Sequence, residues 1–173
     1  MANEFDFSSL SLRDALDLAV FIEEEAKERY DDFAAQMDAH HTPDAAKFFR
    51  LMAANELKHA ERISAKRNER FGDEPITVSR SVIFDVEAPE FDQARAFMSP
   101  HQALEVALES ETKAREFYEG ALATVEDSDL RELFAWLRDE EIDHQRMVRE
   151  LMAKVPTGGT LDPDDFVDPP TAQ

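Results

Sequence analysis

The chain of 173 residues carries two copies of a pattern whose side chains can bind metal ions. Each copy has a glutamate, a tyrosine seven residues later and, roughly a helix length further on, a Glu-x-x-His sequence. The copies are Glu23, Tyr30, Glu56 and His59, then Glu111, Tyr118, Glu141 and His144. The repetition indicates one site built from two matching halves.

Residues three positions apart lie on the same face of a helix, so each Glu-x-x-His sequence directs a carboxylate and an imidazole to one side. One such sequence arises often by chance in an acidic helix. Two of them, each paired with a lone glutamate on another helix, form the ligand set of a carboxylate-bridged two-metal site in a four-helix bundle. We therefore predict six metal ligands, which are Glu23, Glu56, His59, Glu111, Glu141 and His144.

Oxygen and nitrogen ligands without thiolates favour two iron ions, with manganese or zinc as alternative occupants. Four carboxylates offset the four positive charges of two divalent ions. Without metal, four buried like charges would repel one another and lose hydration energy. A purely structural role for six converging polar side chains is therefore a poor explanation of the pattern.

Neighbouring glutamates compete for the same roles. Glu23 belongs to a run of three glutamates, which is typical of a solvated helix face, and Glu109 and Glu140 lie close to Glu111 and Glu141. The repeat favours Glu23, Glu111 and Glu141, because only these keep the same spacing in both halves. A single histidine would more often be a buried packing residue, but the symmetric pair favours metal ligation.

Tyr30 and Tyr118 occupy matching positions and are our candidate catalytic residues. Their expected role is to hydrogen-bond the ligand carboxylates from the outer shell. The alternative is that both are ordinary core aromatic residues.

Apolar residues recur at the three- and four-residue spacing of buried helix faces in four segments. Capping residues, prolines and glycine mark the ends of these segments. We expect helices from Ser11 or Asp14 to about Ala39, from a start at Thr42-Pro43-Asp44 to about Phe71, from Ser99-Pro100 to about Thr124, and from a cap at Asp127-Ser128-Asp129 to a point before Pro156. With only four glycines, the chain is predicted to be all-α.

Residues 73–98 differ from the helical segments, because they contain prolines and β-branched patches. A connection of this length suits a crossover between two helical hairpins, with a short helix near Phe91 to Phe97. We expect one domain over residues 1–159. The Asp- and Pro-rich tail, residues 160–173, is expected to be poorly ordered.

Composition excludes several classes of function. The net charge of −20 opposes binding to DNA or RNA, whose phosphates would be repelled. The absence of cysteine removes disulfides, iron–sulfur ligation and thiol nucleophiles. No apolar stretch reaches the ~20 residues that span a bilayer, and no secretory signal is visible, so we expect a cytoplasmic protein.

The chain resembles the ferritin-like superfamily, and more closely its rubrerythrin-type branch, over roughly residues 11–154. The matching stretches are Glu23 to Tyr30, Asn55 to Ala60, Glu111 to Tyr118 and Glu140 to His144. The resemblance implies an up-down-down-up bundle with Glu23, Glu56 and His59 chiefly at one iron. It places Glu111, Glu141 and His144 at the other iron, with Glu56 and Glu141 as bridges.

Two departures from rubrerythrin accompany this resemblance. The chain lacks the cysteines of a rubredoxin domain, and Ala114 stands where rubrerythrins place an extra glutamate. The ligand set therefore looks closer to the symmetric four-Glu, two-His set of bacterioferritin-like centres.

The first functional hypothesis is a di-iron oxidoreductase that oxidises ferrous iron with O2 or H2O2, as a ferroxidase or a peroxide-reducing enzyme with an external electron donor. Oxidation of an organic substrate is a second hypothesis. The third is a non-enzymatic iron-binding or regulatory bundle. The long crossover and the acidic tail favour a homodimer over a large cage.

Overall fold

The structure is a computed structural model of the chain, and it describes residues 7, 10–82 and 86–155. Its long helices are α1 (Leu12–Ala39), α2 (Pro43–Phe71), α3 (Pro100–Thr124) and α4 (Ser128–Met152). A short 3-10 helix, η2, covers Arg80–Val82. No β-strand occurs among the described residues. The predicted all-α fold of four helices in two hairpins is confirmed, whereas the tail at 160–173 lies outside the described residues.

Side-chain caps fix three of the helix starts. Ser11 accepts a hydrogen bond from the backbone N–H of Asp14 at the start of α1. Ser99 and Gln102 form a reciprocal capping box at the start of α3. Asp127 accepts two backbone N–H bonds at the start of α4. Thr42 precedes α2 without a side-chain cap bond, so Pro43 carries the start signal there.

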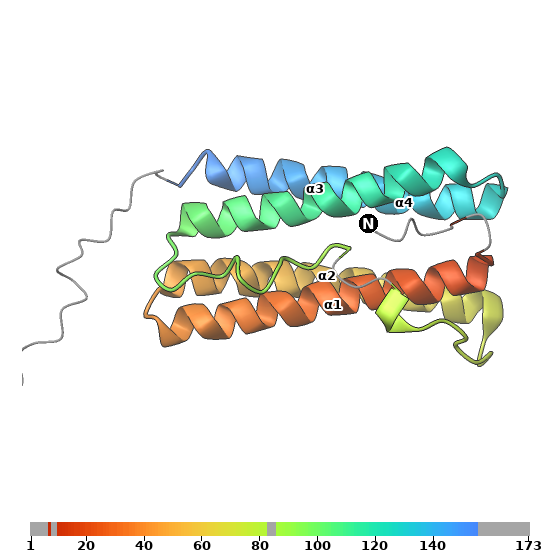
Figure 1. Cartoon of the computed structure of the whole chain (residues 1–173), viewed down its shortest axis with the longest axis horizontal. Coiled ribbons are helices and arrows are strands. Elements are labelled where there is room, and N and C mark those ends of the chain that lie inside the picture. Colours follow the sequence, from red (N-terminus) through yellow and green to blue (C-terminus); the bar gives the residue numbers. More distant parts are fainter. Residues whose placement is uncertain (1–6, 8–9, 83–85, 156–173) are drawn as a thin grey trace, which may run out of the picture.

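The four helices form two antiparallel hairpins, α1–α2 and α3–α4, within which the helices contact each other most extensively. Figure 1 shows that the chain returns along the first hairpin after α2, so α3 begins at the end of the bundle where α1 turns into α2. Consequently α2 and α3 run in the same direction, and the two hairpins bring their long faces together. None of the helices in the described part is long and apolar enough to span a bilayer.

We call the crossover between α2 and α3, residues 73–98, the return segment. It does not contain the short helix predicted near Phe91 to Phe97, because those residues form turns and irregular backbone. Side chains of α1 hold its carbonyl groups instead. The Arg29 guanidinium donates to the carbonyl oxygen of Pro89, and Gln36 donates to that of Ala94 at 3.1 Å. These contacts hold the irregular segment against α1.

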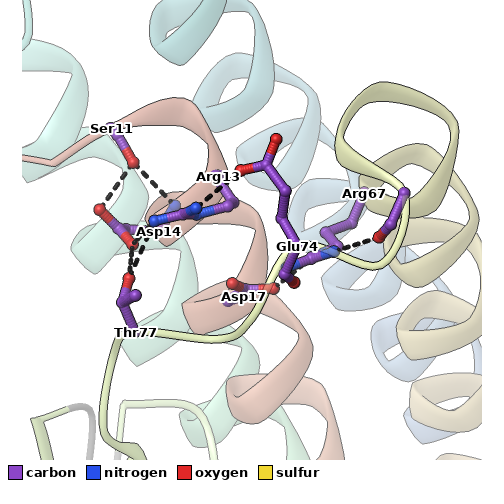
Figure 2. A network of polar contacts seen from close by, with 8 residues as sticks. Ser11, Arg13, Asp14, Asp17, Arg67, Glu74 and Thr77 are labelled. Carbon is purple, nitrogen blue, oxygen red and sulfur yellow. Dashed lines mark hydrogen bonds and ion pairs between the residues drawn. The ribbon is translucent and has the colours of Figure 1, made fainter.

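A polar network fastens the start of the return segment to α1 and α2 (Figure 2). Arg67 on α2 donates from Nε to Asp17 on α1 at 2.8 Å and also bonds the carbonyl oxygens of Gly72 and Glu74. Thr77 donates to Asp14 at 2.6 Å. The chain is therefore fixed to the hairpin immediately after α2 ends.

The hydrophobic core is divided into two clusters by a polar layer. One cluster contains Tyr30, Phe33, Phe49, Met52 and Leu104. The other contains Leu16, Ile22, Ile63, Tyr118 and Leu137. In every long helix a buried glutamate lies between the residues that join one cluster and those that join the other.

Candidate metal centre

Each long helix contributes one glutamate to the polar layer. These are Glu23 from α1, Glu56 from α2, Glu111 from α3 and Glu141 from α4. All four are at most 1% exposed. The competing Glu109 is exposed and accepts a hydrogen bond from Gln93, while Glu24 and Glu140 are only partly buried. The structure thus brings the four glutamates chosen by the repeat into the interior.

Three of these glutamates lack the hydrogen bonds that buried carboxyl groups normally make. Both carboxyl oxygens of Glu23, Glu56 and Glu141 are without a hydrogen-bond partner among the described residues. Burial, and secondarily the charge of Glu87, raises the pKa of each of the three well above its usual range. An unsatisfied buried carboxyl group is costly, so six such oxygen atoms pointing into one layer indicate a ligand for them.

The fourth glutamate is paired with a histidine. Glu111 Oε2 lies 2.8 Å from Nδ1 of His144, and Glu141 Oε2 lies 3.6 Å from the same nitrogen. Burial disfavours the charged forms of Glu111 and His144, but the hydrogen bond and the charge attraction between the two side chains outweigh this effect. The pKa of Glu111 therefore lies below its usual value, and the pKa of His144 rises to about 10. Nδ1 of His144 therefore faces the carboxylates.

His59 presents the same nitrogen to the other half of the layer. Its Nδ1 lies 3.7 Å from Glu23 Oε2 and 3.9 Å from Glu56 Oε2. Burial, together with the charge of His144, lowers the pKa of His59 to about 4, which keeps the imidazole neutral at pH 7. A neutral imidazole is the form that binds a metal ion.

Glu140, considered from the sequence only as a competitor of Glu141, contacts the outer side of His59. Its Oε2 lies 3.4 Å from His59 Nε2, and its Oε1 accepts hydrogen bonds from Arg62 and Trp136. A carboxylate on the second ring nitrogen of a ligand histidine fixes the orientation of the ring. The His59 and His144 rings lie parallel, with centroids 4.6 Å apart.

The two tyrosines differ in their contacts. The Tyr30 hydroxyl donates to Glu111 Oε1 at 3.3 Å, so it contacts one carboxyl group of the layer. The Tyr118 hydroxyl is buried and has no hydrogen-bond partner among the described residues. Burial, followed by the charges of nearby glutamates, raises the pKa of both hydroxyls well above their usual range. Both groups are therefore protonated at neutral pH.

A fifth glutamate, Glu87 of the return segment, reaches the same layer and was not predicted. It is 1% exposed, and neither of its oxygens has a hydrogen-bond partner among the described residues. Burial, and secondarily the charge of Glu111, raises its pKa to about 8. The polar layer therefore holds a fifth buried acid beside the four glutamates expected from the sequence. The signal that could have revealed Glu87 is weak: an acid whose nearest neighbours, Val86, Ala88 and Pro89, are apolar.

Ligand atoms in the layer lie close enough together to share metal ions. In each of three groups of residues, the ligand atoms all lie within 4.8 Å of one another. The groups are Glu56, His59 and His144; Glu111, Glu141 and His144; and Glu23, Glu56 and Glu87. Glu56 and His144 each belong to two groups. Unsatisfied carboxyl oxygens with two imidazole nitrogens and no thiolate fit a pair of iron or manganese ions.

Comparison with known proteins agrees with this arrangement. The rubrerythrin family model matches residues 14–152, and also residues 102–167. A crystal structure of an uncharacterised conserved protein from Magnetospirillum magnetotacticum MS-1 is similar, with a TM-score of 0.68 and 27% sequence identity over 86% of this chain and 98% of that one. No match was found among the curated proteins. With four helices in two hairpins and a buried Glu/His layer between them, the chain belongs to the rubrerythrin family, within the ferritin-like di-iron carboxylate superfamily.

Proposed function

We propose that the protein is a di-iron oxidoreductase, which binds two ferrous ions in the polar layer and oxidises them with O2 or H2O2. One observation carries the proposal. Four glutamates and two histidines from four helices converge in the interior, and three of the carboxyl groups have no hydrogen-bond partner among the described residues. Two metal ions would supply the positive charge that offsets the cost of burying these groups.

The six ligands divide between the two iron positions. Glu23, Glu56 and His59 would chiefly hold one ion and Glu111, Glu141 and His144 the other, with Glu56 and Glu141 shared between the two. The inward Nδ1 atoms of both histidines support this division, since each faces the carboxylates of its own set. In this arrangement iron supplies the redox chemistry, by passing electrons from two ferrous ions to the oxidant.

The surrounding protein orients the ligands and limits access of water. Glu140 holds the outer nitrogen of His59, and Tyr30 donates to Glu111. The two apolar clusters close the layer from either side. Repeated turnover needs an external electron donor, because the chain has no cysteine to relay electrons. Iron detoxification and peroxide removal are the two physiological outcomes that this chemistry serves.

Anaerobic iron binding followed by rapid mixing with oxidant tests the proposal. The protein should bind two ferrous ions per chain, and O2 or H2O2 should produce a ferric absorption band at a matching stoichiometry. Glu56→Ala should lose both ions because Glu56 bridges, whereas the matched control Glu24→Ala should retain both. Full iron occupancy in Glu56→Ala would refute the assignment. Binding without oxidation would instead identify a non-enzymatic iron-binding bundle.

A further inference from the structure

Among the described residues, Glu87 is the one carboxyl group of the polar layer that no helix supplies. It lies in the return segment between η2 and α3, where most acidic residues are exposed. Its side chain is 1% exposed, both oxygens lack a hydrogen-bond partner, and no ion pair of the described residues includes it. Burying an acid without a partner is unfavourable, so this position requires an explanation.

The oxygens of Glu87 point to a defined place. A ligand atom of Glu87 lies within 4.8 Å of ligand atoms of Glu23 and Glu56. Three carboxylate oxygens at this spacing can surround one cation, and the neutral imidazole of His59 lies beside two of them, with its Nδ1 3.7 Å from Glu23 Oε2 and 3.9 Å from Glu56 Oε2. The group of ligand atoms that Glu87 joins is the one built by α1 and α2, although the charge of Glu111 on α3 also acts on Glu87.

The return segment is held so that Glu87 stays in this position. Arg29 of α1 is 3% exposed, donates to the carbonyl oxygen of Pro89, and has its guanidinium carbon 3.3 Å from the centroid of the Phe91 ring. Ala88 and Pro89, which follow Glu87 directly, are buried as well. Further along, Gln93 donates to Glu109 of α3 at 2.9 Å. The segment is therefore attached to both hairpins by residues that follow Glu87 in the chain.

We propose that Glu87 is a fifth carboxylate ligand, which binds the metal ion held by Glu23 and Glu56. This inference rests on the proposed two-metal site. Because the return segment occurs once in the chain, the repeat provides no counterpart of Glu87 on the α3–α4 half. The two metal positions are consequently unequal: the α1–α2 position has one more anionic ligand and binds divalent cations more tightly.

Anaerobic titration of the purified full chain with ferrous iron tests the inference, with calorimetry and metal analysis as readouts. Wild-type protein should bind two ions with different affinities. Glu87→Gln should weaken the iron affinity of one binding step about 10-fold or more. Even mutation of residues that only hydrogen-bond a metal ligand typically lowers metal affinity about 10–100-fold. The other step should change little. Glu90→Gln is the matched control, because it removes the same charge from an exposed position three residues away and should leave both steps unchanged.

The outcomes separate this inference from the proposed function. If wild-type protein fails to bind two ions, both are overturned. If wild-type protein binds two ions and Glu87→Gln binds them with unchanged affinities, only the role of Glu87 is overturned. An anomalous-scattering crystal structure of the iron-loaded wild-type protein gives a readout without any substitution. It should show a Glu87 oxygen bound to the ion beside Glu23, and a Glu87 side chain turned away from both ions would contradict the inference.

Discussion

In the metal-free protein, the free energy of unfolding should decrease as pH rises. The contribution of a single group, Glu87, to this pH dependence can be measured. The pKa of Glu87 is raised from 4.5 to about 8 by burial and then by the charge of Glu111. Between these values the folded protein holds a proton that the unfolded chain releases. The contribution of Glu87 is fully present below about pH 4.5 and is lost as pH rises towards about 8.

The magnitude follows from proton linkage. A group that is protonated in the folded state and ionised in the unfolded state lowers the free energy of unfolding by about 1.4 kcal/mol per pH unit. Over the window of Glu87 this amounts to roughly 4–5 kcal/mol, a large fraction of the ~5–15 kcal/mol that stabilises a typical domain. Glu23, Glu56 and Glu141 add to the same trend, because their pKa values are raised in the same direction.

Urea unfolding between pH 5.5 and 7.5 in the presence of a chelator measures the effect. Glu87→Gln should reduce the downward slope by about 1.4 kcal/mol per pH unit relative to wild-type protein, and Glu90→Gln should not change it. Bound metal lowers the pKa values of its carboxylate ligands, so stability of the metal-loaded protein should instead increase from acid to neutral pH. Equal slopes for chelated wild-type protein and Glu87→Gln would refute the burial of an ionisable group at this position.

Other substitutions have distinct expected results. Tyr30→Phe should destabilise the chelated protein by about 1 kcal/mol, because a buried carboxylate loses its donor, whereas Tyr118→Phe should be neutral or stabilising in the same urea experiment. Asp17→Ala should lower the melting temperature, because Arg67 loses its carboxylate partner. If the two side chains act as a pair, Asp17→Ala should lower the melting temperature much less in a protein that already carries Arg67→Met. Ser99→Ala should cost about 1 kcal/mol in thermal or urea unfolding through loss of the capping box, and no change would show that Pro100 alone sets the start of α3.

The helices and the layer of four glutamates were predictable from the sequence because both depend on local spacing. A cap such as Ser99 or Asp127 acts on the next few residues, so its position marks a helix end to within about a residue. Likewise, the period of a helix decides that Glu111 faces inward while Glu109 faces solvent.

The position of Glu87 and the path of the return segment were not predictable in this way. Irregular backbone has no period, so the side to which each side chain points depends on distant partners. Here those partners are Arg29 and Gln36 on α1, which bind carbonyl oxygens of the segment about 60 residues later in the chain. In a chain of net charge −20, one more acid in a connection looks like a surface residue.

The division of the site between two hairpins has a consequence for how the protein folds. Each hairpin joins two helices that follow one another directly in the chain, so α1–α2 and α3–α4 can form early and fast. The carboxyl groups come together only when the hairpins dock, which makes docking the step that must bury them. Metal captured at that moment should act on the late part of folding: with ferrous iron present, unfolding should slow markedly while the formation of helix in each hairpin keeps its rate.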